Sequence, residues 1–322
     1  MHTYTAAGNY TVSLTITSNA GSDTETKIDY IKVTRESFVD FVINENVFIY
    51  GNRLSFAGNT INGSGATIIL TGGLNTADTN LGASVAATTI YIDGDVIMDG
   101  GSAGLGSLPH PGNIYVNGDL TLGTGARHIH GNVYVNGDFI LKDARIHGTV
   151  YVDGDLTLQW TPLLAESARI YYTGTFTHPA TMDPALLAKC IYQPTVPGFD
   201  MPDQQLPPPK SADWYAAKGY VSSGTLTSNL KIFAPGYSST TWRPSATDVV
   251  IVAHSGDITI TGLGGSSLTG VLFAPNGRVT FGGAAFNGVV ITRDGFFVTS
   301  GGTSVTFSNL AGYFSSPDDY LF

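Results

Sequence analysis

One short motif occurs four times in this chain and carries most of the residues that could do chemistry. The copies read IYIDGD, IYVNGD, VYVNGD and VYVDGD, so each has a tyrosine two residues before an Asp or Asn. A row of carboxylates could bind Ca²⁺, and a row of tyrosines could bind a carbohydrate or a partner chain. The tyrosines are Tyr91, Tyr115, Tyr134 and Tyr151, with Tyr171 from a weaker fifth copy, and the polar columns are Asp93, Asn117, Asn136 and Asp153, then Asp95, Asp119, Asp138 and Asp155.

The polar columns have two interpretations. Asn and Asp are preferred in turns because they tolerate positive φ and hydrogen-bond to nearby backbone. Ca²⁺ would instead relieve the repulsion between stacked carboxylates. The glycine-rich nonapeptide of calcium-binding β-rolls is absent, so we expect turn chemistry and no cofactor, with Ca²⁺ as the alternative. The residues that would hold Ca²⁺ are Asp93, Asp95, Asp119, Asp138, Asp153 and Asp155.

The five tyrosines alternate with aliphatic residues along the sequence. In a strand, this pattern directs the aliphatic side chains inward and the tyrosines outward. If the copies of the motif stack as neighbouring strands, successive tyrosines lie about 4.8 Å apart. A proline-rich excursion of the chain or a neighbouring domain could cover this column, which is the interpretation we favour. The alternative is a binding face for carbohydrate or a partner, in which case Tyr134→Ala should weaken binding without unfolding the protein.

Histidines recur before two successive copies of the motif. His130 and His147 fall at equivalent positions, and His128 lies nearby. Imidazoles with a free face could hold Zn²⁺. The flanking Arg127 and Arg145 disfavour a cation, and Asp143 is the one acidic residue in this part of the repeat. We therefore expect a stack of solvent-exposed histidines rather than a metal site.

Catalysis and ice binding are the other classes of function considered. Polysaccharide-cleaving β-helices need clustered carboxylates, whereas the adjacent pair here, Asp318-Asp319, lies near the C-terminus. We therefore expect no enzyme. An ice-binding face would need a regular threonine column, but the outward positions of the second strand are mixed: Ile97, Thr121, Ile140 and Thr157.

The spacing of the motifs predicts the fold. Their central glycines are 24, 19 and 17 residues apart, and later copies are centred on Gly256, Gly277 and Gly295. Such spacings suit the rungs of a β-solenoid, in which short strands joined by glycine corners stack on the rung below. Separate Asn-Gly hairpins are the alternative. We predict an all-β chain, built as a parallel β-helix (β-solenoid) from about residue 40 to the C-terminus.

Composition agrees with this class. Of the 322 residues only 12% are charged and 40 are glycine, against roughly 25% charged and 7% glycine in typical soluble domains. The net charge of −10 and scattered Lys and Arg argue against nucleic acid as a partner. We expect no membrane insertion, because no apolar run approaches the ~18 residues needed. Cys190 stands alone, so no disulfide framework is expected.

The N-terminal residues resemble a known domain. HTYTAAGNYTVSLTITSNAGSDTETKIDYIKV, with His2 and Tyr4 before Gly8 and the alternating Tyr10, Val12, Leu14 and Ile16, resembles the closing strands of a PKD domain. PKD domains are Ig-like β-sandwiches common on bacterial and archaeal surface proteins. The resemblance implies a partial sandwich over residues 1–36, and we expect the chain to be a fragment of a longer surface protein.

Two weaker resemblances concern the solenoid. GVLFAPNGRVTFGGAAFNGVVITRDGFFVTSGG resembles the C-terminal β-helix of PilX-like, pilus-associated surface proteins. The G-x-V/I-x-V-x-G-D-L spacing resembles bactofilins, a polymerising β-helix. The membrane-inserting helix of pilus proteins is absent, so these resemblances imply an extracellular β-helix without a defined biochemical role.

A proline-rich segment divides the solenoid. PTVPGFDMPDQQLPPPK cannot pair in a ladder, so we expect an excursion with short helices at 183–189 and 212–218. The C-terminal SNLAGYFSSPDDYLF would be either a cap or a docking segment. The expected divisions are residues 1–36, a first solenoid half at 37–177, the excursion at 178–247, and a second half with the C-terminal cap at 248–322.

Together these patterns predict a structural or adhesive protein of the cell surface or extracellular space. A rigid solenoid offers repetitive faces to other surface proteins, to copies of itself or to a polysaccharide. A carbohydrate-binding or polysaccharide-degrading β-helix and an ice-binding solenoid are the alternatives.

Overall fold

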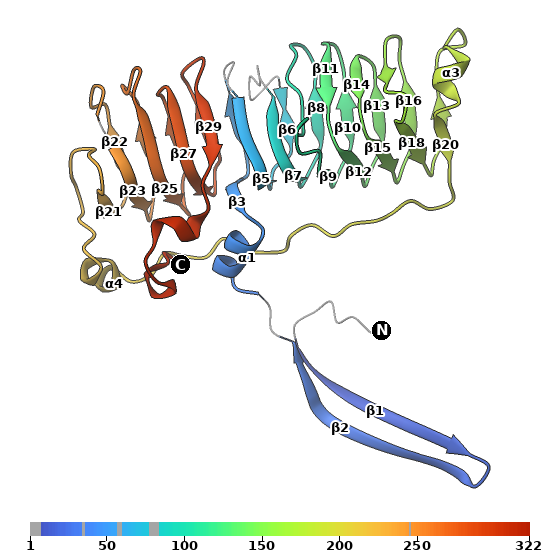
Figure 1. Cartoon of the computed structure of the whole chain (residues 1–322), viewed down its shortest axis with the longest axis horizontal. Helices are drawn as coiled ribbons and strands as arrows, with labels where there is room; N and C mark the ends of the chain where they lie inside the picture. The colour runs from blue at the N-terminus through green and yellow to red at the C-terminus, as the bar shows by residue number, and fades with distance from the viewer. Residues whose placement is uncertain (1–7, 34–35, 57–59, 77–83, 245) are drawn as a thin grey trace.

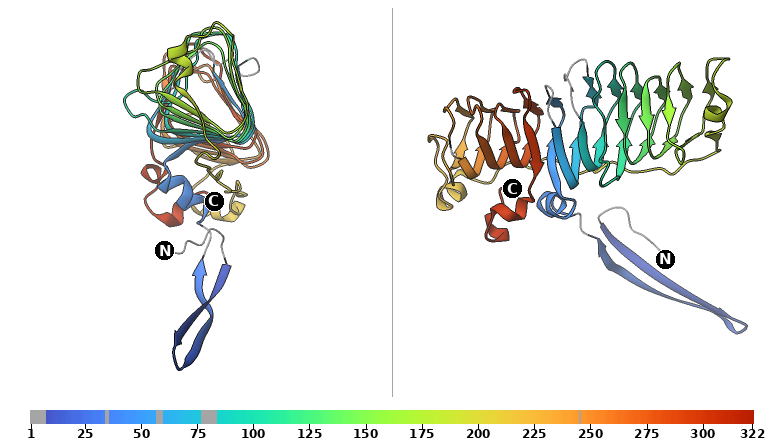
Figure 2. Two further views of the ribbon diagram at one scale, coloured as in Figure 1. Left: turned by 90° about the vertical axis from the view of Figure 1, so that its right-hand side faces the viewer. Right: turned by 45° about the horizontal axis from the view of Figure 1, so that its top comes forward.

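The computed structural model of the chain describes residues 8–33, 36–56, 60–76, 84–244 and 246–322. It confirms the predicted class: the chain is mostly β, and parallel sheets coil into a solenoid (Figure 1). Seen end on, the coil has a roughly triangular outline (Figure 2). The repeated motifs pair in parallel, as Val133 does with Val150, so the alternative of separate hairpins is wrong.

The largest sheet contains 13 strands and runs the whole length of the solenoid. Along its path the strands are β20 (Cys190–Tyr192), β18 (Arg169–Tyr172), β15 (Thr149–Val152), β12 (Asn132–Val135), β9 (Asn113–Val116), β7 (Val85–Ile92), β5 (Thr60–Leu70), β29 (Ser304–Phe307), β27 (Ala285–Thr292), β25 (Ser267–Ala274), β23 (Ala246–Ala253) and β21 (Lys231–Ala234). A further strand, β3 (Val47–Gly51), pairs with both β27 and β5.

Three smaller sheets form the other sides of the coil. The six-stranded sheet contains β6 (Leu74–Asn75), β8 (Val96–Met98), β10 (Leu120–Leu122), β13 (Phe139–Leu141), β16 (Leu156–Leu158) and β19 (Phe176–Thr177). The five-stranded sheet contains β22 (Tyr237–Ser239), β24 (Ile258–Ile260), β26 (Val279–Phe281), β28 (Phe296–Val298) and β4 (Leu54–Phe56). The three-stranded sheet contains β11 (Arg127–Ile129), β14 (Ala144–Ile146) and β17 (Leu163–Leu164).

The two halves of the solenoid meet at the first rungs of the chain. The first half winds outward from β5 to β20, and the second half begins at the opposite end with β21 and winds back until β29 pairs with β5 (Figure 1). The proline-rich excursion runs along the solenoid from one end to the other. The second half therefore stacks on the first rungs of the first half, rather than on the rung where the excursion leaves.

Aliphatic side chains fill the interior of the coil. Ile114, Val133, Val150 and Ile170 are at most 2% exposed and follow one another in parallel register. Burying each such side chain stabilises the fold by roughly 1.5–3 kcal/mol of transfer free energy. Glycine corners permit the rungs to stack closely: a Cβ at Gly148 would collide with the Gly131 carbonyl oxygen.

A second apolar core lies outside the coil, against the outer face of the largest sheet. Here α1 (Phe38–Asn44), α4 (Ala212–Ala217), η1 (Leu310–Tyr313) and η2 (Pro317–Asp319) flank the sheet (Figure 1). Strands with both faces buried have continuous apolar sequences, which explains VVIVA in β23 and VLFA in β25. From the sequence, the C-terminal segment is expected to be either a cap or a docking segment. Its contacts are those of a cap that covers this face.

The remaining elements are short or stand apart. β1 (Gly8–Ser18) and β2 (Gly21–Val33) form an antiparallel hairpin that extends away from the solenoid (Figure 1). His2 and Tyr4 lie outside the described residues. In the excursion, α3 (Pro184–Leu187) is capped by Asp183 and α4 by Ser211, at the expected places.

Candidate contact faces of the solenoid

The five tyrosines of the motif form one stacked column on the outer face of the largest sheet. Ring centroids are 4.7 Å apart for Tyr91 and Tyr115, 5.0 Å for Tyr115 and Tyr134, 5.1 Å for Tyr134 and Tyr151, and 5.5 Å for Tyr151 and Tyr171. The planes differ by at most 22°. Strand register places these rings at the rung spacing, so each ring stacks on the next.

The column continues into the second half of the solenoid, where other segments cover it. Tyr215 of α4 stacks on Phe233 at 4.0 Å. Phe322 lies 4.9 Å from Phe273, and Phe38 of α1 lies 5.4 Å from Tyr50. The tyrosine motif does not predict this extension, because aliphatic residues replace tyrosine at several rungs.

The excursion covers the middle of the tyrosine column. The Phe199 ring lies 5.1 Å from Tyr115 and 6.5 Å from Tyr134, and the Tyr50 hydroxyl donates a hydrogen bond of 3.0 Å to the Gln204 carbonyl. Burial, with smaller contributions from Tyr115 and a nearby glutamate, raises the pKa of Tyr91 to about 12. A binding role for the five tyrosines stays a prediction. A ligand that stacks on Tyr115 would have to displace Phe199.

The carboxylates of the second polar column each accept a hydrogen bond from the next rung. Asp95 Oδ1 accepts from the amide of Asp119 at 2.9 Å, and Asp119 Oδ1 from the amide of Asp138 at 2.8 Å. Asp138 and Asp155 continue the series, to the amides of Asp155 at 2.8 Å and Thr175 at 2.6 Å. We call these four residues the aspartate ladder. Backbone amides at the turns thus offset the repulsion between its carboxylates.

The first polar column is held together by side-chain amides and a hydroxyl. Asn117 donates to Asp93 at 2.7 Å, and Asn136 donates to Asn117 at 3.2 Å. Thr173 donates to Asp153 at 3.1 Å. Ca²⁺ binding by either column stays a prediction, and these contacts engage one oxygen, Oδ1, of the aspartates concerned.

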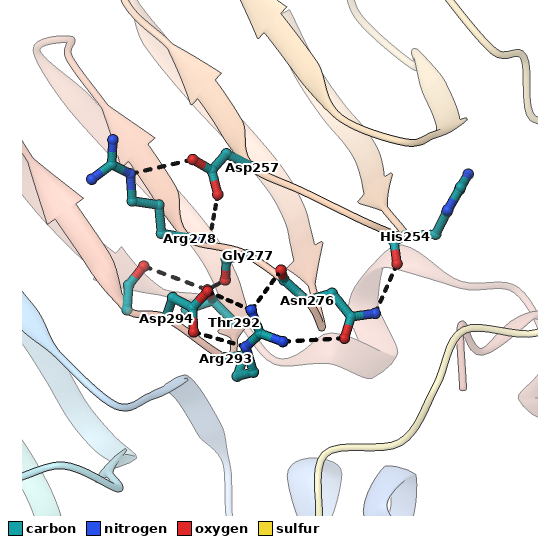
Figure 3. Close-up of polar contacts among 9 residues, drawn as sticks. His254, Asp257, Asn276, Gly277, Arg278, Thr292, Arg293 and Asp294 are labelled. Carbon is teal, nitrogen blue, oxygen red and sulfur yellow. Dashed lines mark hydrogen bonds and ion pairs between the residues drawn. The ribbon is translucent and has the colours of Figure 1, made fainter.

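The second half has equivalent turn contacts, shown in Figure 3. Asp257 Oδ1 accepts from the amide of Arg278 at 3.0 Å, and the Arg278 side chain lies 3.4 Å from the other carboxylate oxygen. Asn276 donates to the His254 carbonyl at 2.8 Å, and Arg293 donates to the Asn276 carbonyl at 2.9 Å (Figure 3). The turns of both halves are therefore stabilised from rung to rung by side chains.

An uncharged column lies on the six-stranded sheet, next to the aspartate ladder. Ile97, Thr121, Ile140 and Thr157 occupy the outward middle positions of β8, β10, β13 and β16 and pair in parallel register. Their side chains are partly exposed, and Ile97 is 39% exposed. We call these four residues the threonine–isoleucine column.

The remaining residues singled out from the sequence lie in two places. His128, His130 and His147 gather on the side of the three-stranded sheet, with their ligand nitrogens within 4.8 Å of one another. Asp319 is paired with Lys218 at 2.6 Å, and this hydrogen bond lowers the pKa of Asp319. The Asp318-Asp319 pair thus lies in η2, where Asp319 joins the C-terminal segment to the end of α4.

Comparisons with known proteins identify the N-terminal segment. A family model described as a PKD domain matches residues 1–33, which confirms that resemblance. No curated protein matches. The comparisons do not support the resemblances to PilX-like proteins or to bactofilins. Within the described residues, no helix is both long and apolar enough to cross a membrane.

One solved structure is similar along most of the chain. It is described as a possible adhesin C-terminal domain from Caldicellulosiruptor kronotskyensis. The identity is 12%, the match covers 89% of this chain and 96% of that one, and the TM-score is 0.27.

Proposed function

We propose that this chain is a structural or adhesive component of the cell surface, and that its solenoid makes an extended contact with an uncharged polysaccharide. The PKD match at residues 1–33 supports a surface location, because PKD domains are common on surface proteins. The stacked core supports a rigid rod, since every rung is fixed to its neighbours by ladder hydrogen bonds and buried side chains.

The contact face is inferred from which faces of the solenoid are left uncovered by other segments of the chain. Much of the outer face of the largest sheet is covered, by α1, α4 and the C-terminal segment in one part and by the excursion at Tyr115 and Tyr134 in another. The threonine–isoleucine column is partly exposed and uncharged, and this is the observation that carries the proposal. A row of hydroxyl and aliphatic groups suits a polymer that has both polar and apolar surface.

The aspartate ladder beside this column selects among polymers. Its carboxylates, together with a net charge of −10, would repel an acidic polysaccharide. The hydroxyls of a neutral polysaccharide can instead donate hydrogen bonds to carboxylates. We therefore assign neutral polysaccharide as the partner.

Sedimentation with insoluble polysaccharides tests this proposal. The full chain is mixed with cellulose, chitin or insoluble acidic pectin, and the bound fraction is measured for the wild type and two double variants. T121E/T157E places charge on the column, and T17E/T225E makes the same change at exposed sites elsewhere. We expect binding to a neutral polymer that T121E/T157E reduces at least tenfold and T17E/T225E preserves.

Three results would contradict the proposal. They are no retention on either neutral polymer, stronger retention on the acidic polymer, and equal retention of the two double variants.

A further inference from the structure

Three histidines from two rungs form the tightest group of metal-ligating side chains in the described part of the chain. His128 and His130 lie on one face of the β11 rung, because residues two apart in a strand point the same way. His147 occupies the equivalent position to His130 one rung later, since Ile129 pairs with Ile146. The cluster is therefore a triangle fixed by strand register.

Distances within the triangle suit one metal ion. His128 Nδ1 lies 2.9 Å from His147 Nε2. Two nitrogens that bind one tetrahedral Zn²⁺ at about 2.1 Å stand about 3.4 Å apart, so these two nitrogens would move apart by about half an ångström. The three ring planes lie within 24° of one another, and metal ligation uses the in-plane lone pair, so the rings would also turn to face one ion. The ring centroids of His130 and His147 are 4.3 Å apart, and those of His128 and His130 are 5.7 Å apart.

The backbone holds the cluster in place. The amide of His130 donates to the Leu105 carbonyl at 2.8 Å, and the amide of His147 donates to the Ile129 carbonyl at 3.0 Å. A site on paired strands is pre-organised, so little conformational entropy is lost when the ion binds.

The charge around the cluster is less repulsive than the sequence suggests. Arg127 is 1% exposed, and its guanidinium donates to the carbonyls of Ala103, Gly100 and Thr124. Arg145 remains beside the cluster, in register with His128.

We propose that His128, His130 and His147 bind a divalent transition metal of the Zn²⁺ type. Imidazole nitrogens suit Zn²⁺, Cu²⁺ and Ni²⁺, whereas Ca²⁺ and Mg²⁺ prefer oxygen. A pocket of about 340 Å³, lined by His130, His147 and the loop residues Leu108 and Pro111, borders the cluster. It gives room for water as the fourth ligand. When the ion binds, the proton in the hydrogen bond between His128 and His147 moves to the second nitrogen of the imidazole that carries it. Both facing nitrogens are then free to bind the ion, and no further group has to accept the proton.

Calorimetric titration of the metal-free, untagged full chain with ZnCl₂ tests the proposal. We expect one Zn²⁺ per chain, and H147A and H130Q should each weaken binding at least about tenfold, because each removes a ligand. Matched controls are H178A and H254A, which change histidines outside the cluster and should bind as the wild type does. R145Q should bind more tightly, since it removes a positive charge.

Two further measurements keep the test decisive. Circular dichroism establishes that each variant is folded, and H130Q serves if H147A is not. Co²⁺ bound at the cluster should give the strong visible absorption of a four-coordinate site, which H130Q abolishes. Stoichiometric binding that persists in both cluster variants, or wild-type heats no larger than those of H147A, would overturn the proposal.

Discussion

Val305 of β29 lies in parallel register with Ile61 of β5, and both side chains are at most 1% exposed. The last strand of the chain therefore pairs with one of the first strands of the solenoid. This seam joins two halves that would otherwise each have an uncovered end, where unpaired backbone and apolar core would meet water. The two halves should depend on each other for stability.

Ile61→Ala tests the seam. Removing this buried side chain should cost about 2–5 kcal/mol, and the cost should appear in both halves. Trp160 lies in the first half and Trp242 in the second, so urea unfolding of single-tryptophan variants reports on each separately. The account predicts that both midpoints fall. A fall confined to the Trp160 signal would show that the halves unfold independently.

Asp138→Ala removes one member of the aspartate ladder. The amide of Asp155 loses its acceptor at the turn, and by comparison with the loss of a helix cap this should cost about 1 kcal/mol. Asp138→Asn keeps an oxygen acceptor and is the matched control, expected to lie close to the wild type. Denaturant titration measures both. A loss for Asp138→Asn as large as that for Asp138→Ala would mean that the charge itself is needed.

Removing Ca²⁺ should leave the solenoid folded. The Asp columns are bound to backbone amides and side-chain amides, and the buried aliphatic core supplies the stability. Thermal melts of metal-free protein in EDTA and in excess Ca²⁺ should agree within a few degrees. A rise of more than about 10 °C with Ca²⁺ corresponds to several kcal/mol of linked binding, and would show that the columns are calcium sites.

Phe199→Ala should uncover the middle of the tyrosine column. Because Phe199 contacts Tyr115 and Tyr134, tetranitromethane should nitrate these two rings faster in the variant, as mass spectrometry of peptides can show. Tyr171 lies farther along the column and is the internal control. Unchanged nitration of Tyr115 would mean that Phe199 does not shield the ring, whereas a general increase would indicate unfolding.

Local patterns were sufficient to predict the coil itself. Alternation such as Val133-Tyr134-Val135 correctly predicted an aliphatic interior and an outward tyrosine column, because side-chain direction in a strand depends only on position. The junction of the halves could not be predicted. The pairing of β29 with β5 depends on stacking between rungs far apart in the sequence, and neither strand carries the repeated motif.

The sites were predicted less completely than the fold. The sequence placed His128, His130 and His147 together, but it did not show that Arg127 is buried, with its guanidinium bonded to backbone carbonyls. The outward column of the second half could not be predicted, because Phe233, Val252 and Phe273 lie in continuous apolar strands, where the sequence does not distinguish outward side chains from interior ones. Its partners, α4 and the C-terminal residues, are brought to it only by the tertiary fold.

The most direct test of the proposed polysaccharide contact is a labelling footprint on the threonine–isoleucine column. Burial raises the pKa of the Cys190 thiol to about 12, so this native thiol should react slowly with iodoacetamide. Thr121→Cys, Thr157→Cys and Thr225→Cys each add a reactive thiol, the last away from the column. Labelling rates are measured with and without the neutral polysaccharide that binds. The account predicts at least fivefold slower labelling at positions 121 and 157 and no change at position 225. Equal rates at all three positions, under conditions where the protein is bound, would contradict it.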